Sequence, residues 1–219
     1  MTKKPRVQAP TQRSSAGEGP SRRGVLAAVV GFLAALVLGG ALFFVLRGSD
    51  SGPDAELVRA DLGAAGCTLV AKKALSGAHS VVDPGGTSPK WNTDPPTSGP
   101  HYPVAAVFNI YDQELELARV VHNLEHGGIY ILYGKDVPAA TVDQLRAFYD
   151  DHKTGTIMAP LDRLGDEFAL GVWVASQDPA MAYLAKCTSF DEGAVDAFFR
   201  AFQFQGPERF DPSQLRPGQ

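Results

Sequence analysis

The chain has 219 residues, of which 44% are hydrophobic and 20% are charged, and 20 Lys and Arg stand against 24 Asp and Glu. This length accommodates one domain of about 150 residues and a further segment. Six of the basic residues and one of the acidic residues precede Gly24, which leaves 14 basic and 23 acidic residues, a net charge of −9, in the remainder. A part of the chain this acidic is not suited to nucleic acid or anionic lipid headgroups, because both require basic patches on the protein.

An apolar segment near the amino terminus predicts a single-pass membrane anchor. Residues 24–46, GVLAAVVGFLAALVLGGALFFVL, carry no charge, and roughly 20 such residues cross a bilayer as a helix. The basic excess in residues 1–23 places this disordered tail in the cytoplasm and everything after Arg47 outside the cell membrane. A cleaved signal is the alternative, because SRRGVL resembles the twin-arginine export pattern. The length of the apolar run and the lack of a small-x-small site directly after it favour the anchor, followed by a linker over residues 47–55.

The remaining residues, 56–219, predict one compact extracytoplasmic domain of the α+β (mixed α/β) class. Its core has to come from roughly residues 56–205, and a loop rich in Gly, Pro, Ser and Thr runs from Gly77 to Pro103. Apolar periodicity and capping residues predict strands over 67–73, 128–134 and 168–176 and helices over 112–126, 138–152 and 191–203. Strands and helices in short alternation indicate a single domain, although their order does not fix the sheet topology.

Two cysteines, Cys67 and Cys187, lie near the two ends of this domain. Thiols oxidise outside the cytoplasm, and only one pairing is available, so we expect a disulfide that closes the domain. Two unpaired structural cysteines are the alternative. Neither residue belongs to a C-x-x-C pair, so the sequence gives no indication of thiol catalysis.

The stretch VVHNLEHGG places His122 and His126 four positions apart with Glu125 between them. On a helix these two histidines are neighbours that can share a metal ion, whereas on a strand they would be roughly 13 Å apart. A helical wheel centres the apolar stripe on Val121 and Leu124 and places both histidines at its flank, where they would face the surface or a cleft.

A third ligand is expected from TDPPTSGPHYP, where closely spaced prolines restrict the backbone around His101. Three imidazoles from His101, His122 and His126 suit Zn or Cu, with Glu125 as a fourth ligand or as a residue that orients them. His79 and His152 are expected to face solvent.

Two other interpretations remain open. The letters H-x-x-E-H also match the inverted zinc-protease motif, in which Glu125 would activate water and Glu192 would be a further ligand. In a purely structural interpretation, His126 and Gly127 end a helix without any metal. A serine nucleophile is not indicated, because Ser98 lacks the G-x-S-x-G pattern.

Taken together, PPTSGPHYP and VHNLEHGG, with a membrane anchor before them and a cysteine after a Trp-containing strand, resemble the bacterial membrane-anchored DUF3105 family. The resemblance covers roughly Cys67 to Pro207 and supplies no reaction or cofactor. It implies that the two motifs form a shared metal- or ligand-binding site. The expected partners of the protein are the membrane, a metal ion or a cell-envelope protein. Two other functions compete with metal or ligand binding: a metal-dependent hydrolase, and a structural or interaction module of the cell envelope. The implied ligands are His101, His122, Glu125 and His126, with support from Pro96, Ser98, Gly99, Tyr102 and Asn123.

Overall fold

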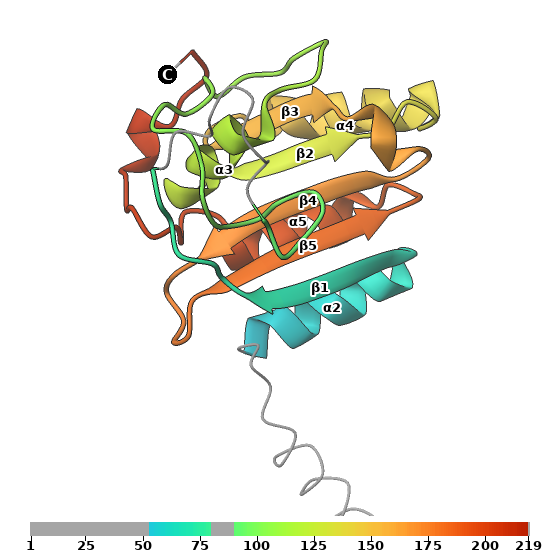
Figure 1. The fold of residues 1–219 in the computed structure, drawn as a ribbon. Coiled ribbons are helices and arrows are strands. Elements are labelled where there is room, and N and C mark those ends of the chain that lie inside the picture. Colours follow the sequence, from blue (N-terminus) through green and yellow to red (C-terminus); the bar gives the residue numbers. More distant parts are fainter. Residues whose placement is uncertain (1–52, 80–89, 219) are drawn as a thin grey trace, which may run out of the picture. The chain divides into compact units, whose positions relative to one another are not determined.

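The computed structural model describes residues 53–79 and 90–218, which form a five-stranded sheet with helices on both faces (Figure 1). The predicted cytoplasmic tail and transmembrane helix lie outside the described residues, as does most of the predicted linker. Within the described part of the chain, none of the helices combines the length and the apolar character needed to cross a membrane.

The strands are arranged in the order β1-β5-β4-β2-β3. Neighbouring strands are antiparallel, except that β2 and β3 are parallel, so the sheet is mixed. The parallel pair is joined by a crossover through α4, as parallel strands require. The strands are β1 (Cys67–Lys73), β2 (Ile129–Tyr133), β3 (Thr156–Pro160), β4 (Phe168–Val174) and β5 (Met181–Cys187).

Three of the described helices cover one face of the sheet, and one helix covers the other. Apolar residues of α2 (Pro53–Ala64), α4 (Ala139–Asp151) and α5 (Glu192–Phe202) pack in one core with one face of the sheet. Helix α3 (Leu117–Glu125) packs on the other face together with the loop before it. Two short 3-10 turns, Asp162–Leu164 and Pro212–Gln214, complete the fold.

The sequence of strand β2 explains why helices cover both faces of the sheet. Its sequence IYILY is apolar at every position, so alternate side chains must be buried on opposite faces. Ile129 and Ile131 lie in the core beneath α4 and α5, whereas Tyr130 and Leu132 lie in the core beneath α3. The continuous apolar run therefore fixes a central strand with a helical layer on either side.

The predicted disulfide is present. Cys67 and Cys187 are register partners on β1 and β5, and their Cα atoms are 4.1 Å apart. The bond joins positions 120 residues apart in the sequence and ties the first strand of the domain to the last.

Four elements differ from the sequence prediction: α2, β3 and β5 were not predicted, and α3 is shorter than predicted. Helix α2 was not predicted, and it begins within the last three residues of the predicted linker. Strand β3 ends in a proline, which the sheet tolerates because β3 is an edge strand. Strand β5 contains two alanines, so its β-propensity is weak and its pairing on both sides determines its structure. The helix predicted over 112–126 is shorter, since α3 starts only at Leu117.

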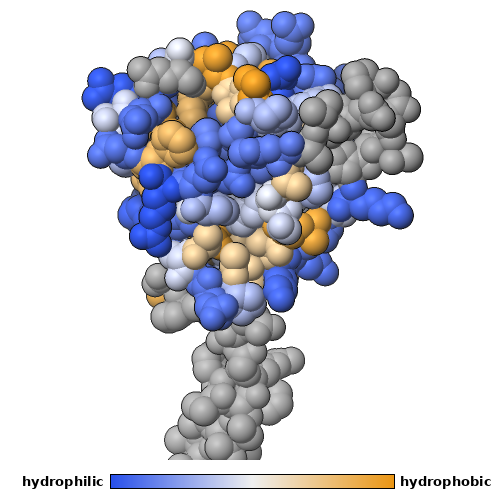
Figure 2. All heavy atoms as spheres, turned by 60° about the vertical axis from the view of Figure 1, so that its left-hand side comes forward, coloured by the Kyte–Doolittle hydropathy of each residue, from blue (hydrophilic) through white to orange (hydrophobic). Residues whose placement is uncertain are grey.

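Figure 2 shows the molecule from the side at the left of Figure 1. Most of the visible described surface is hydrophilic, and smaller apolar patches lie between the polar regions. The exposed large apolar side chains of the described residues include Val104, Val107 and Phe210, which belong to segments that pack around α3.

Candidate metal site

Two loop segments, 75–78 and 98–101, are hydrogen-bonded to each other, and this brings His79 next to His101. The backbone N–H of His101 donates to the carbonyl of Ala78 at 3.0 Å, and the N–H of Leu75 donates to the Ser98 hydroxyl at 3.0 Å. Gly99 has a φ of +109°, and an added Cβ there would be 3.1 Å from the Leu75 side chain. The close approach of the two loops therefore requires glycine at this position.

Helix α3 supplies the other site residues from its last two turns. His122 and Glu125 are both buried, at 6% exposure each. Asn123 between them attaches the preceding loop to the helix, since its Oδ1 accepts from the Ala106 N–H at 3.0 Å and its Nδ2 donates to the Ala106 carbonyl at 2.7 Å. This loop covers the flank of α3 that the helical wheel assigned to a surface or cleft.

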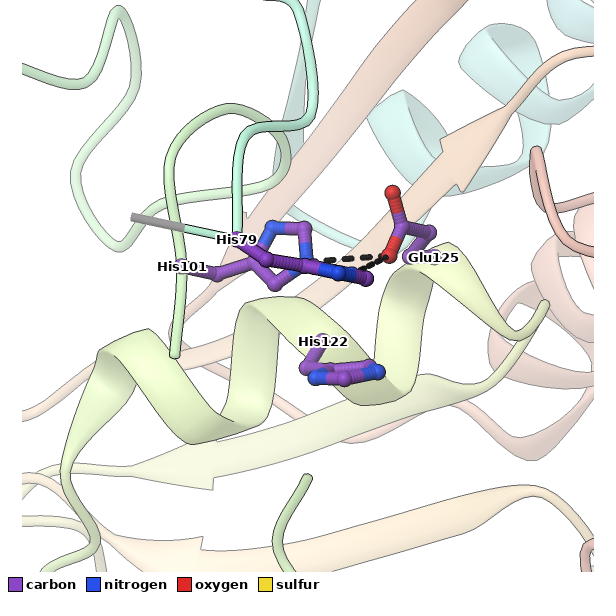
Figure 3. Close-up of side chains that lie close together, drawn as sticks. All are labelled: His79, His101, His122 and Glu125. Atoms are coloured by element: carbon purple, nitrogen blue, oxygen red, sulfur yellow. Dashed lines mark hydrogen bonds and ion pairs between the residues drawn. The ribbon is translucent and has the colours of Figure 1, made fainter. Parts of the chain in front are cut away.

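His79, His101, His122 and Glu125 form a compact cluster (Figure 3). The three imidazole ring centres are 4.9 to 5.0 Å from one another, so they form a nearly equilateral triangle. The Oε2 atom of Glu125 is 2.9 Å from Nε2 of His101 and 3.0 Å from Nε2 of His79. One nitrogen or carboxylate oxygen of each residue lies within 4.8 Å of those of the other three, as the ligands of a single ion must.

Backbone carbonyls fix the orientation of the two buried histidines. Nδ1 of His101 is 2.8 Å from the Gly99 carbonyl, and Nδ1 of His122 is 2.7 Å from the Tyr102 carbonyl. A carbonyl only accepts, so each Nδ1 carries a hydrogen and donates it, and in the neutral ring Nε2 keeps a free lone pair. Burial lowers the pKa of His122 from its ordinary value of 6.5, which favours that neutral ring.

His101 has an unusual nitrogen at the centre of the cluster. The side chain is fully buried, and among the described residues its Nε2 has no hydrogen-bond partner. The Glu125 oxygen is at ion-pair distance, but it lacks the alignment of a hydrogen bond. With Nδ1 already donating, a neutral His101 directs an acceptor nitrogen toward an acceptor oxygen. A cation between these two atoms, or an added proton, is needed to make the contact favourable.

His126 lies in a second, outer group with His122 and Glu208. Its ring centre is 4.5 Å from that of His122, and its Nε2 is 3.3 Å from Oε2 of Glu208. Burial lowers the pKa of His126 as well, and the charge of His122 acts in the same direction. The side chains are 16% and 45% exposed for His126 and Glu208, so this group lies nearer to solvent.

The carboxy-terminal segment reaches this outer group because two glycines allow close packing at the end of α3. Gly127 has a φ of +90°, and a Cβ there would be 2.9 Å from the Phe204 backbone. A Cβ on Gly206 would be 2.3 Å from the Glu125 carbonyl oxygen. The N–H of Glu208 donates to that same carbonyl at 2.9 Å. The HGG sequence therefore ends the helix and also makes room for the segment that carries Glu208.

Three of the four ligands expected from the sequence, His101, His122 and Glu125, lie in one cluster. His126 adjoins His122 but groups with Glu208. His79 is 46% exposed, and it nevertheless belongs to the cluster, which the expectation of a purely solvent-facing residue missed.

Other residues considered in the sequence have structural positions. His152 packs on Phe148 at a ring distance of 3.9 Å and lies 3.5 Å from Asp196, outside both groups. Ser98 is buried and its hydroxyl accepts from the Leu75 N–H. Glu192 begins α5, whose core is on the opposite face of the sheet from α3, so it is not placed to be a ligand.

Comparison with known proteins gave one match. The sequence model of the family described as "Protein of unknown function (DUF3105)" matches residues 85–214, more than half of the chain. No curated protein and no solved structure matches the chain. The matched range includes both motifs and Glu208, and it begins after His79.

Proposed function

The chain belongs to the DUF3105 family of proteins of unknown function, and we propose that it is a metal-binding protein that holds one transition-metal ion between His79, His101, His122 and Glu125. The observation that carries this proposal is the buried Nε2 of His101, which faces a carboxylate oxygen without a hydrogen-bond partner among the described residues. An ion bound by both atoms would convert this unfavourable contact into two coordination bonds.

The spacing of the three ring centres supports the same proposal. Three imidazoles that bind one zinc ion at about 2.0 Å in tetrahedral geometry have ring centres about 5 Å apart. The three ring centres here are separated by 4.9, 4.9 and 5.0 Å. Metal-bound histidines usually donate the other ring N–H to a carbonyl or carboxylate, and His101 and His122 each have a backbone carbonyl in that position.

The donor set favours zinc or copper. Three imidazole nitrogens and one carboxylate oxygen suit both ions, whereas Mg²⁺ and Ca²⁺ prefer oxygen ligands. Four protein ligands also complete a tetrahedral zinc site, while a hydrolytic zinc site keeps one position open for water. Glu125 in this proposal is a ligand and is therefore not free to act as the base of a hydrolase. We accordingly favour ion binding over hydrolysis.

We further propose that the domain is extracytoplasmic and anchored in the cell membrane by residues 24–46. The proposal is supported by the uncharged run of 23 residues, by the basic residues before it and by the disulfide, because disulfides persist in oxidising compartments. Carbonate extraction of bacterial membranes followed by protease treatment of intact spheroplasts tests it. The protein should stay with the membrane and lose its domain to the protease, and release by carbonate would refute the anchor.

Metal content tests the proposed function. The full-length protein, purified with a histidine-free tag, is loaded with Zn²⁺ or Cu²⁺, dialysed without chelator and analysed by mass spectrometry of the metal. We expect about one ion per chain, and a loss of that ion in His101→Ala and Glu125→Gln.

The matched control is His152→Ala, which removes another half-buried histidine that faces an acidic residue. It should retain the full metal content. A wild-type protein that retains neither ion, or variants at His101 and Glu125 that bind as well as the wild type, would refute the proposed function.

A further inference from the structure

His122 is shared by two groups of potential ligands. The inner group contains His79, His101 and Glu125, and the outer group contains His126 and Glu208. No other residue belongs to both groups among the described parts of the chain. An ion in either group would therefore use the same imidazole.

That imidazole has only one nitrogen to offer. Its Nδ1 donates to the Tyr102 carbonyl at 2.7 Å, so Nε2 is the atom available to a metal. One lone pair binds one ion, and the inner and outer groups cannot both use His122 at the same time. The arrangement describes two alternative positions for one ion better than two separate sites.

The two positions differ in burial and in number of ligands. The inner group has four members, of which His101 and Glu125 are buried and His79 is 46% exposed. The outer group has three members, and Glu208 is 45% exposed. Additional ligands favour the inner position at equilibrium, whereas exposure makes the outer carboxylate easier for an incoming hydrated ion to reach.

The backbone that carries the outer carboxylate is also held in place. The Glu208 N–H donates to the Glu125 carbonyl at 2.9 Å, and the Phe204 N–H donates to the Gly127 carbonyl at 2.8 Å. These bonds attach the carboxy-terminal segment to the end of α3, next to His126. Glu208 is therefore positioned by the backbone of an inner ligand and is not simply a surface acid near a histidine.

We propose that His126 and Glu208 form an outer loading position, from which the metal ion enters and leaves the inner four-residue site by ligand exchange at His122. This inference rests on the proposed function, since it concerns access to the same site. His126 and Glu208 are positioning residues for the ion in transit, and they are not part of its resting ligand set.

Transfer kinetics with Zn²⁺ test this inference. Uptake of zinc by the metal-free full-length protein and its removal by a chromogenic chelator are followed by stopped flow, and equilibrium titration gives the Kd. Glu208→Gln removes the charge of an exposed side chain, so the fold should be retained. We expect uptake and removal to slow together by about tenfold, with one zinc ion per chain and a Kd within about twofold of the wild type.

Three further variants distinguish the outer loading position from the inner site. His126→Gln should behave as Glu208→Gln, and His152→Ala should leave both rates unchanged. His79→Ala removes an inner ligand and should weaken the Kd. Unchanged rates in Glu208→Gln would overturn the loading position and would indicate entry on the exposed His79 side. Two zinc ions in the wild type and one in Glu208→Gln would also overturn it, by making the outer group a separate site. A wild-type protein that takes up no zinc would instead refute the proposed function.

Discussion

Removing the Asn123 side chain should destabilise the domain at the point where the site is covered. Asn123 is 1% exposed, and its amide makes hydrogen bonds to both the N–H and the carbonyl of Ala106. Asn123→Ala leaves these two main-chain groups without partners, and each such loss costs about 1–3 kcal/mol. Because the loop lies near solvent, where water can replace part of the loss, we expect the free energy of unfolding to fall by about 2–4 kcal/mol.

The same change should weaken metal binding, because the loosened loop carries the Tyr102 carbonyl that fixes the His122 ring. Loss of such an orienting contact typically costs about 10- to 100-fold in affinity. Denaturant unfolding of the metal-free full-length chain, followed by tryptophan fluorescence, and a zinc titration measure the two effects.

Asn109→Ala is the matched control, since Asn109 is exposed and its side chain accepts, among the described residues, only from the neighbouring N–H of Ile110. This control should lose less than about 0.5 kcal/mol. Equal unfolding free energies for Asn123→Ala and Asn109→Ala would refute the reasoning that the buried amide attaches the loop to α3.

Two further predictions concern the disulfide and pH. Replacing Cys67 and Cys187 together by alanine opens a loop of 120 residues, which should lower the free energy of unfolding by about 5 kcal/mol; a loss below about 1 kcal/mol in denaturant titration would contradict the entropic account. Burial holds the pKa values of His122 and His126 below 6.5 in the folded protein, so between those values and 6.5 the unfolded chain binds more protons. The metal-free protein should therefore lose stability as the pH falls below about 6.5, and a Tm that stays constant or rises from pH 7.5 to pH 5.5 would show this sign to be wrong.

Local sequence patterns were sufficient for the elements that bury a regular apolar face. Strand β1 agrees with its predicted range, and the predicted ranges of β2, β4, α4 and α5 contain the observed elements. Strands β3 and β5 have weaker local signals, a terminal proline in one and alanines in the other. Their structure depends on neighbouring strands, and the strand order is equally a tertiary property.

In the candidate site, too, some residues were predictable from local sequence patterns and others depend on tertiary contacts. His122 was predicted from its helical spacing to His126, Glu125 from its position between these two histidines, and His101 from the prolines that stiffen its loop. His79 was missed because its place depends on the bond between the His101 N–H and the Ala78 carbonyl, a contact between two loops that no spacing in the sequence indicates. Glu208 was missed because its place depends on the bond between its N–H and the Glu125 carbonyl, a contact between the carboxy-terminal segment and α3.

Burial of the site could not be predicted from the helical wheel. The wheel correctly placed His122 at the flank of the apolar stripe, but a helix flank is exposed only when no other segment covers it. Here the loop held by Asn123 covers that flank and buries the ring. The same burial lowers the pKa of His122 and so favours its neutral ring.

The most direct test is a crystal structure of the zinc-loaded protein with anomalous diffraction data collected on both sides of the zinc absorption edge. We predict one strong peak within about 2.0–2.2 Å of Nε2 of His101 and of His122, a nitrogen of His79 and an oxygen of Glu125. The Nδ1 atoms of His101 and His122 should remain hydrogen-bonded to the Gly99 and Tyr102 carbonyls. A map without an anomalous peak among these four side chains, from protein crystallised with excess zinc, would contradict the metal site.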